Sequence, residues 1–309
     1  METYAPLCFQ GTTTLLVLVG GRGDRRPEAS GLGDRGIKHI KMADKLGLSL
    51  VQLQGPRNGV LLLKLNRPES GNSLHPKLVA DMLRAIRWAE QNKNVKVIVL
   101  TGNGQFFCTG MELISNDEMS FAIGSDFHQL NEALILSEKI LIAAVNGPAV
   151  GYGVSSLALL DLVYSIPDAY FFTPFVKWGM APEAASSLTF ARIMGHQRAS
   201  LLCLTGERIL APEAMQLGLV SKVLPAKDFM GQVMEIAENL AQSPTGSLQG
   251  TKRLMKQSVI KELLEANDRE CRLIHEERIP SGDPQKGKKQ FELAQRQKRK
   301  FKQLAKGLL

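Results

Sequence analysis

The sequence predicts an α/β fold with mainly parallel strand pairing. Three observations predict it. The 309-residue chain is 44% hydrophobic and 22% charged, a composition typical of a globular protein with a sizeable core. From Gly59 onward, short apolar runs of strand length alternate with segments of helical period. No stretch approaches the ~20 apolar residues of a membrane-spanning helix, so we expect no membrane association.

The expected strands are apolar runs bounded by Gly, Pro or Asn. They are Val60–Asn66, Val95–Thr101, Ile140–Asn146, Leu162–Ile166 and Leu219–Leu224. Between the first two, apolar residues at helical spacing predict an amphipathic helix of about four turns, with Pro76 tolerated in its first turn. Strands that are apolar on both faces and joined by helices favour parallel pairing.

After Pro244 the chain becomes polar and helical in pattern. Leu254, Val259, Leu263 and Leu264 predict one amphipathic stretch, and a final helix follows it. We therefore expect three parts: an N-terminal extension over 1–49, a core over 50–245, and a C-terminal helical region over 246–309 with a basic final helix.

The first fifty residues do not read as part of the core. Residues 20–36 are rich in Gly and charge, and they have no period that could bury a face. Met42 begins a segment that looks like a natural N-terminus, so two interpretations of residues 1–41 stay open: a disordered leader or an artefact of start-site assignment. The apolar run Leu15–Val19 is too short for a signal-peptide core. We expect an intracellular protein.

The net charge of +8 is concentrated in the last fifth of the chain. Residues 1–50 carry +2, residues 51–250 carry −2 and residues 251–309 carry +8. A nucleic-acid-binding module usually has a basic footprint on its folded body, and the middle of this chain has none, so nucleic acid is not an expected partner. The four cysteines contain no C-x-x-C pair and the five histidines no H-E-x-x-H. Neither a disulfide framework nor a metal site is predicted.

Two near-motifs fail on their spacing. The run TGNGQF from Thr101 resembles the start of a dinucleotide fingerprint, but its third Gly would fall at Phe107. The segment Gly153–Leu157 lacks the final Gly of G-x-S-x-G. Neither a dinucleotide site nor a serine hydrolase is therefore expected.

Two glycine-rich turns, Phe106–Leu113 and Ala143–Gly153, share a physical logic. Each follows a hydrophobic strand, and such turns leave backbone N–H groups able to point at a ligand. A helix beginning near Tyr152 would add its positive end. Two such donors converging on a carbonyl oxygen form an oxyanion hole, although on local sequence alone the simpler interpretation is that these glycines make tight turns.

The order of five segments along the chain favours the oxyanion-hole interpretation over simple tight turns. They are Leu65–Leu74, Val97–Leu113, Ala143–Ser165, Ala169–Ser187 and Leu204–Pro225. In this order and without large gaps, the chain from about Leu50 to its C-terminus resembles the crotonase superfamily of acyl-CoA enzymes, the enoyl-CoA hydratases and isomerases. The resemblance implies a spiral of β-β-α units with a C-terminal helical region, a homotrimer or hexamer, and a CoA thioester as substrate. It implies no metal or redox cofactor.

Carried over by position, the resemblance implies that the backbone N–H groups of Met111 and Tyr152 form the oxyanion hole. Side-chain identity matters little there, because the donor is the backbone. The substrate-binding positions it implies are Ser73, Leu74, Cys108, Thr109, Gly110, Glu112 and Gly151. Of these, Cys108 is by default a small buried hydrophobe, and Glu112 is expected to be structural or adjacent to the substrate rather than the base.

The acid and base are where members of this family diverge. Its hydratases use two glutamates, and the matching positions here are Ser155 and Phe175, which cannot act as carboxylates. A single carboxylate, Glu183, lies in a P-E-x-x-S-S context similar to that of the Δ3,Δ2-enoyl-CoA isomerase branch. We expect a helix N-terminus after Pro182 to lower its pKa and apolar neighbours to raise it. The competing interpretation is that Glu183 simply favours a first helical turn.

The leading hypothesis is therefore a Δ3,Δ2-enoyl-CoA isomerase. The alternatives are a crotonase-like enzyme with hydratase-type chemistry, and an acyl-CoA-binding or interaction module that has lost catalysis. The basic final helix has three interpretations: contacts to the CoA phosphates, a solvated face, or nucleic-acid targeting. The chain ends Gly307-Leu308-Leu309 and not in a Ser-Lys-Leu-type signal, so a peroxisomal location rests on family analogy beside a cytoplasmic one.

Overall fold

The computed structural model describes residues 45–112 and 119–306. The fold is that of the unit Ile40–Leu309. The two interpretations of residues 1–41 lie outside the described residues. No helix within the described ranges is both long and apolar enough to cross a bilayer.

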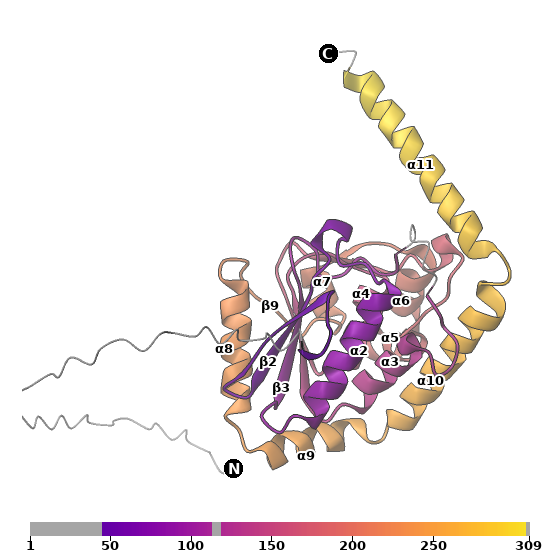
Figure 1. Cartoon of the computed structure of the whole chain (residues 1–309). Helices are drawn as coiled ribbons and strands as arrows, with labels where there is room; N and C mark the ends of the chain where they lie inside the picture. Colours follow the sequence, from indigo (N-terminus) through magenta and orange to yellow (C-terminus); the bar gives the residue numbers. More distant parts are fainter. Residues whose placement is uncertain (1–44, 113–118, 307–309) are drawn as a thin grey trace, which may run out of the picture. The chain divides into compact units, whose positions relative to one another are not determined.

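The strands form two sheets (Figure 1). Those of the larger sheet are, in spatial order, β1 (Val51–Arg57), β2 (Val60–Leu65), β3 (Val97–Gly102), β4 (Ile140–Val145), β6 (Leu162–Ser165) and β9 (Lys222–Val223). Those of the smaller sheet are β5 (Ala149–Val150), β7 (Tyr170–Phe172) and β8 (Ile209–Leu210).

Helices connect and cover these strands. The α-helices of the core are α2 (Pro76–Gln91), α3 (Asp126–Leu136), α4 (Tyr152–Ser155), α5 (Ser186–Met194), α6 (His196–Ser200), α7 (Ala211–Gln216) and α8 (Phe229–Ala241). Those of the C-terminal region are α9 (Thr245–Lys256), α10 (Ile260–Arg272) and α11 (Asp283–Lys306). The short 3-10 helices are η1 (Pro68–Ser70), η2 (Ser156–Leu159) and η3 (Val176–Trp178), and the short π-helices are η4 (Leu201–Thr205) and η5 (Leu273–Arg278).

The larger sheet confirms the predicted α/β class and its parallel pairing. From β2 to β9 each strand runs parallel to its neighbour, and only β1 is antiparallel, to β2. The five predicted strands are β2, β3, β4, β6 and β9. The last is shorter than predicted, because the N–H groups of Leu219 and Val220 both donate to the Ala214 carbonyl at the end of α7.

The pattern missed four strands, β1, β5, β7 and β8. Three of them have only two or three residues, too few for a period to show. The fourth, β1, contains Gly55 and Pro56 and is mostly exposed beyond Val51, so it lacks the continuous apolar run that marks its neighbours.

Alternate residues of the central strands build two cores, one on each face of the larger sheet. Val97, Val99 and Ile142 pack against the buried face of α8. Ile98, Leu100 and their neighbours face the other way, into the larger cluster that includes α2 and α3 (Figure 1). The site lies on the α2–α3 side, where the ends of the strands turn into the glycine-rich loops.

The C-terminal region is helical as predicted, but the single amphipathic stretch is two helices. The Leu254 side chain is 72% exposed on α9, whereas Leu263 is buried on α10. Leu248, and not Leu254, makes the apolar contact of α9 with a core, and Lys252 is buried beside it, with its Nζ 2.7 Å from the Asp161 carboxylate and 2.6 Å from the Lys139 carbonyl oxygen. An ion pair therefore accompanies the apolar contact of this helix.

Candidate active site

The two glycine-rich turns lie side by side. Cys108 and Ala149 form a parallel bridge, and the Val150 N–H donates to the Cys108 carbonyl at 2.8 Å. Gly110 has a φ of +78°, and a Cβ placed on it would lie 2.8 Å from the Val150 carbonyl oxygen. Both the left-handed backbone and the close approach therefore require glycine at this position.

Each turn presents one backbone donor. Among the described residues, neither the Met111 N–H nor the Tyr152 N–H donates to a protein acceptor. Tyr152 is the first residue of α4, where an N–H has no partner within the helix. The preceding Gly151 has a φ of +53°, and a Cβ on it would lie 3.6 Å from the Gly110 Cα. Two unpaired donors on adjacent turns are the arrangement an oxyanion hole needs.

The structure brings the other predicted substrate-binding positions to these turns. The Leu74 N–H donates to the Gly110 carbonyl at 2.7 Å, and the Glu112 N–H donates to the Leu74 carbonyl at 2.9 Å. The Thr109 N–H donates to the Gly71 carbonyl at 3.1 Å. Ser73 precedes Leu74 and is buried. The 73–74 segment therefore edges the turn that carries Met111.

The Glu112 side chain is paired with Arg67. Its carboxylate lies 2.9 Å from an Arg67 guanidinium nitrogen, and the same guanidinium donates to the Ser73 carbonyl at 2.8 Å. An ion pair of this kind favours the structural interpretation of Glu112 and ties the turn to the 67–73 segment.

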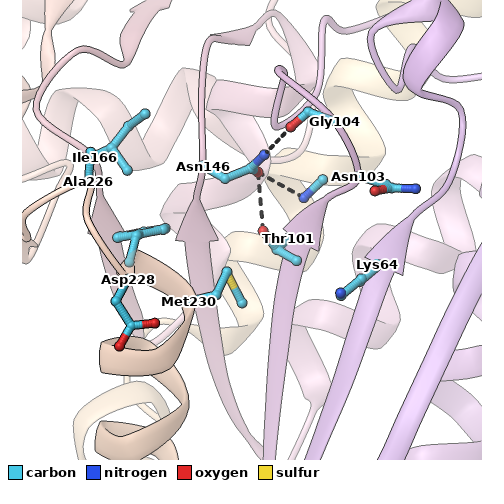
Figure 2. A pocket seen from close by; sticks show the side chains of 11 residues that line it. Lys64, Thr101, Asn103, Gly104, Asn146, Ile166, Ala226, Asp228 and Met230 are labelled. Carbon is cyan, nitrogen blue, oxygen red and sulfur yellow. Dashed lines mark hydrogen bonds between the residues drawn. The ribbon is translucent and has the colours of Figure 1, made fainter.

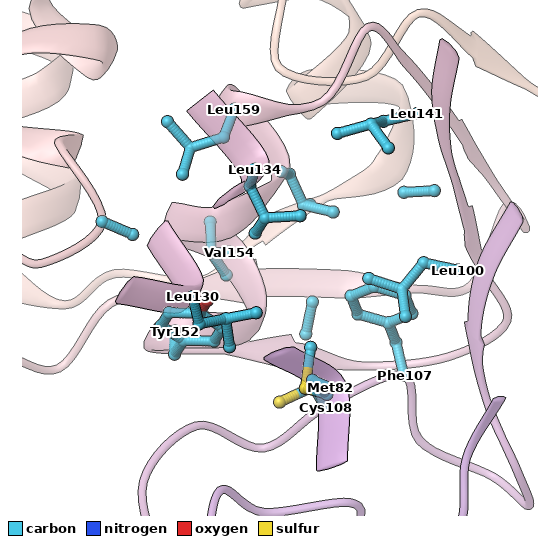
Figure 3. Packing of buried hydrophobic residues seen from close by; sticks show 14 of the residues in the cluster. Met82, Leu100, Phe107, Cys108, Leu130, Leu134, Leu141, Tyr152, Val154 and Leu159 are labelled. Carbon is cyan, nitrogen blue, oxygen red and sulfur yellow. The ribbon is translucent and has the colours of Figure 1, made fainter. Parts of the chain in front are cut away.

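Cys108 and Tyr152 belong to the packed apolar cluster that also contains Met82 and Leu130 (Figure 3). Burial raises the pKa of the Cys108 thiol to about 12, so it behaves as a small hydrophobe. The Tyr152 hydroxyl donates to the Asn131 Oδ1 at 3.0 Å, and the Asn131 amide donates to Asn267 at 2.9 Å. This buried chain anchors the residue that carries the second oxyanion donor.

Tyr152→Phe separates the backbone donor from its side chain. The variant keeps the N–H, so we expect kcat/KM to stay within about threefold of the wild type, whereas losing a hydrogen bond to buried Asn131 should lower the free energy of unfolding by about 1–3 kcal/mol. Steady-state kinetics and urea unfolding measure the two effects. A loss of about 100-fold in kcat/KM with unchanged stability would show that the phenol takes part in the chemistry.

Glu183 is buried, with 5% of its surface exposed. It precedes α5, which begins at Ser186, so the interpretation that it occupies a first helical turn is wrong. Ala184 and Ala185 both have a φ of +56°, which prevents a helix from starting at Glu183. Burial, and secondarily the charge of Glu270, raises the pKa of Glu183 to about 8. Of the two expected opposing effects, desolvation prevails.

The charge of Glu183 acts on a residue of each turn. Its charge adds to burial in raising the pKa of Cys108, and it does the same for the Tyr152 hydroxyl. The residue predicted as the base therefore interacts with both turns, although the predicted donors Tyr152 and Met111 are 31 and 72 residues away in sequence.

Sequence reasoning missed Glu270, the second buried carboxylate near this site. Its two oxygens accept from the Ala185 N–H at 2.7 Å and from the Ser187 N–H at 2.8 Å. Burial raises its pKa to about 6, against the lowering effect of these hydrogen bonds. The only sequence signal is its helical spacing from Leu263 and Ala266, which places it on the buried face of α10.

The two positions that match the hydratase glutamates are buried, and they hold a hydroxyl group and an aromatic ring. Ser155 is fully buried, with its Oγ donating to the Gly151 carbonyl at 3.3 Å, and Phe175 is 5% exposed. Neither of these two residues is a carboxylate. Within the part of the chain that the structure describes, Glu183 precedes α5, and Glu270 contacts the start of α5 from α10.

A histidine with two carboxylates lies apart from this site. The His128 Nε2 is 2.7 Å from Asp268, and its Nδ1 is 3.6 Å from Glu132. The two ring nitrogens face different carboxylates, and one ion cannot engage both nitrogens of one ring. The Gly124 N–H also donates to Nδ1 at 3.3 Å. We interpret the group as a contact between α3 and α10.

Two cavities open on the surface of the unit Ile40–Leu309. One, of about 460 Å³, lies where β2, β3 and β4 end beside α8 (Figure 2). Its central amide is fully engaged, because Asn146 accepts from Thr101 and from the Gly102 N–H and donates to the Gly104 carbonyl.

The second cavity, of about 390 Å³, lies between η3 and the start of α11. Lys177, Arg278 and Lys286 line it together with Asp283. The wall is closely packed, since a Cβ on Gly287 would lie 2.8 Å from the Trp178 backbone and the Trp178 and Phe291 rings are 4.7 Å apart. The first turns of the basic helix thus place cations near the segment that leads to Glu183.

Comparison with known proteins identifies the family. The family model described as enoyl-CoA hydratase/isomerase matches residues 55–304. The chain belongs to the enoyl-CoA hydratase/isomerase family. An enoyl-CoA hydratase/isomerase of Pseudoalteromonas atlantica T6c has the same crotonase fold, with a TM-score of 0.73 and 30% identity over 79% of this chain and 96% of that one.

Relatives within this family carry out different reactions, according to their names. The human enoyl-CoA delta isomerase 2 is 32% identical over 70% of this chain and 57% of its own length. The 2,3-dehydroadipyl-CoA hydratase of Escherichia coli K12 is 34% identical over 64% of this chain and 79% of its own. The family implies an acyl-CoA substrate, and the reaction has to be argued from the site.

Proposed function

We propose that this protein is a Δ3,Δ2-enoyl-CoA isomerase. The observation that carries the proposal is a buried carboxylate, Glu183, that acts electrostatically on residues of the two turns whose Met111 and Tyr152 N–H groups have no acceptor among the described residues, with Ser155 and Phe175 in place of the hydratase glutamates. Addition of water needs a group that positions and deprotonates the water, and neither residue can do so. Moving a double bond within a thioester needs only one carboxyl group.

In the proposed reaction the thioester oxygen accepts hydrogen bonds from the Met111 and Tyr152 N–H groups. The Glu183 carboxylate removes a proton from C2 of the 3-enoyl thioester, and the electrons delocalise to a dienolate whose charge rests on that oxygen. The carboxylic acid so formed returns the proton to C4, which leaves the double bond between C2 and C3. A pKa near 8 suits a group that must accept and release the same proton near neutral pH.

The cavity between η3 and α11 is the proposed binding site of the CoA phosphates. Its lysines and arginine are the groups that bind phosphate, and Met180, which lines it, lies three residues before Glu183. This favours the CoA interpretation of the basic final helix for its first turns. The homotrimer or hexamer and the cellular compartment stay predictions.

Lys177→Glu tests this phosphate-binding site. We expect KM for a 3-enoyl-CoA to rise about tenfold with little change in kcat, because a charge-assisted contact is lost. KM for the matching pantetheine thioester, which lacks the phosphates, should not change. Lys93→Glu, an exposed lysine just after α2, is the matched control. An equal rise in KM for both thioesters would contradict a phosphate contact at Lys177.

The function itself is tested by turnover of 3-enoyl-CoA by the full chain, with the product identified by mass spectrometry and chromatography. Isomerisation leaves the mass unchanged, whereas hydration adds one water. We expect 2-enoyl-CoA as the product. Conversion of 2-enoyl-CoA to a 3-hydroxyacyl-CoA as the main reaction would support the hydratase-type alternative, and binding without turnover across a panel of chain lengths would support the non-catalytic module.

A further inference from the structure

The backbone just after Glu183 adopts an unfavourable conformation. Ala184 and Ala185 both adopt the left-handed conformation, which is unfavourable for residues that have a Cβ. Two local bonds join Glu183 and Ser186: the Glu183 N–H donates to the Ser186 Oγ at 3.2 Å, and the Ser186 N–H donates to the Glu183 carbonyl at 3.1 Å. Two consecutive alanines in this conformation persist only where surrounding groups impose it.

Glu270, from α10, bonds to the backbone on both sides of Ser186. Its Oε2 accepts from the Ala185 N–H at 2.7 Å and its Oε1 from the Ser187 N–H at 2.8 Å, so one carboxylate spans the turn and the start of α5. The side chain is buried, with 5% exposed. Because both of its oxygens are occupied by backbone donors, Glu270 is not placed to exchange protons with a substrate.

The charges around this pair are few. Glu270 faces Ser187 and the thiols of Cys203 and Cys271, with Arg269 beside it on α10. Glu183 is acted on by the charge of Glu270, and its own charge acts on Cys108 and Tyr152, which are neutral because burial raises both of their pKa values. In the described part of the chain, Glu270 is thus the charged group that acts on Glu183 most directly.

We propose that Glu270 is a positioning residue for Glu183: its carboxylate holds the Ala185–Ser187 backbone and thereby sets where the Glu183 carboxyl meets the substrate. Its negative charge also favours the protonated form of Glu183. The inference rests on the proposed function in that Glu183 is taken as the proton-transfer group.

Glu270→Gln tests both effects. The amide keeps one acceptor oxygen but turns an NH₂ toward the second backbone N–H, so we expect kcat for 3-enoyl-CoA to fall about 10- to 100-fold while KM changes less than about threefold. The acid limb of the kcat/KM profile should move to lower pH, because a like charge is removed. Glu265→Gln removes the same charge from an exposed position on α10 and should change neither quantity.

Glu270→Asp separates the effect of the side chain's charge from the effect of its length. It keeps the charge but is one methylene shorter, so it should lower kcat while leaving the acid limb near that of the wild type. This variant also decides the matter if Glu270→Gln does not fold. Wild-type kcat in Glu270→Asp, or wild-type kcat with an unmoved acid limb in Glu270→Gln, would overturn the proposal.

A measurement without turnover separates this inference from the proposed function. NMR of the chain labelled with ¹³C at glutamate carboxyls, assigned with Glu183→Gln, follows the titration of Glu183 directly. A midpoint that is lower in Glu270→Gln supports the inference even if the wild type isomerises nothing, in which case the isomerase proposal alone fails. An unchanged Glu183 titration overturns the electrostatic part of the inference whatever the activity.

Discussion

Glu183→Gln is expected to lower kcat for 3-enoyl-CoA isomerisation by at least about 100-fold, the usual cost of removing a general acid–base group. KM should change little, because the oxyanion donors and the CoA contacts remain. Gln has nearly the shape of Glu and can keep the buried packing. Steady-state kinetics with both variants of the matched pair, Glu183→Gln and Glu112→Gln, measure the effect.

Glu112→Gln serves as the comparison because Glu112 is the other carboxylate beside an oxyanion donor. It loses its ion pair with Arg67, so we expect lower stability and a higher KM, with kcat within about tenfold of the wild type. If Glu112→Gln abolishes turnover and Glu183→Gln does not, the base is Glu112.

The pH dependence of the wild type follows from the Glu183 pKa of about 8. The free enzyme needs the ionised carboxylate to abstract the C2 proton, so kcat/KM should rise with pH up to about 8 and level off above it. In Glu183→Gln the residual rate should lack this limb. A wild-type limb near the ordinary pKa of a glutamate, 4.5, would contradict a buried base.

The same pKa has a consequence for stability. Between the ordinary value of 4.5 and about 8, Glu183 holds its proton in the folded protein and loses it in the unfolded chain. The unfolded chain then binds fewer protons, so the free energy of unfolding falls as pH rises through this window. Glu183→Gln removes that contribution and should lose less stability across the same window in urea titrations.

Gly110→Ala is expected to lower kcat/KM by about 100- to 1000-fold, the magnitude found when an oxyanion donor is lost. The added Cβ would meet the Val150 carbonyl oxygen at 2.8 Å, which forces apart the two turns that carry the Met111 and Tyr152 N–H groups. A left-handed φ of +78° adds strain.

Gly195→Ala is the matched control for this substitution. Its φ of +80° is nearly the same, but a Cβ there would have no atom within 4 Å. Gly195→Ala should therefore lose stability from backbone strain alone, whereas Gly110→Ala should lose stability from both strain and the close contact with Val150, and only Gly110→Ala should lose activity. Equal activity in the two variants would show that the spacing of the turns does not matter for catalysis.

The central strands could be predicted from the sequence because each is a continuous apolar run that its neighbours bury on both faces. The four missed strands are short or, in the case of β1, partly exposed and interrupted by Gly55 and Pro56, so no period marks them. The stretch from Leu254 to Leu264 has one amphipathic pattern, but it spans the end of α9 and the start of α10, and α9 packs through Leu248 and Lys252 rather than Leu254.

The sequence by itself determined the fold class and the two glycine-dependent turns, because strands, helices and turns depend on residues that are close together in the chain. The prediction of Glu183 as the base depended on the order of segments along the whole chain. Only the tertiary structure decided what surrounds them. The hydrogen bonds of Glu270 to Ala185 and Ser187 join residues 85 and 83 apart, and that of Tyr152 to Asn131 joins residues 21 apart. The raised pKa of Glu183 likewise arises from burial by elements distant in sequence, since desolvation depends on what packs around a carboxyl rather than on its neighbours in the chain.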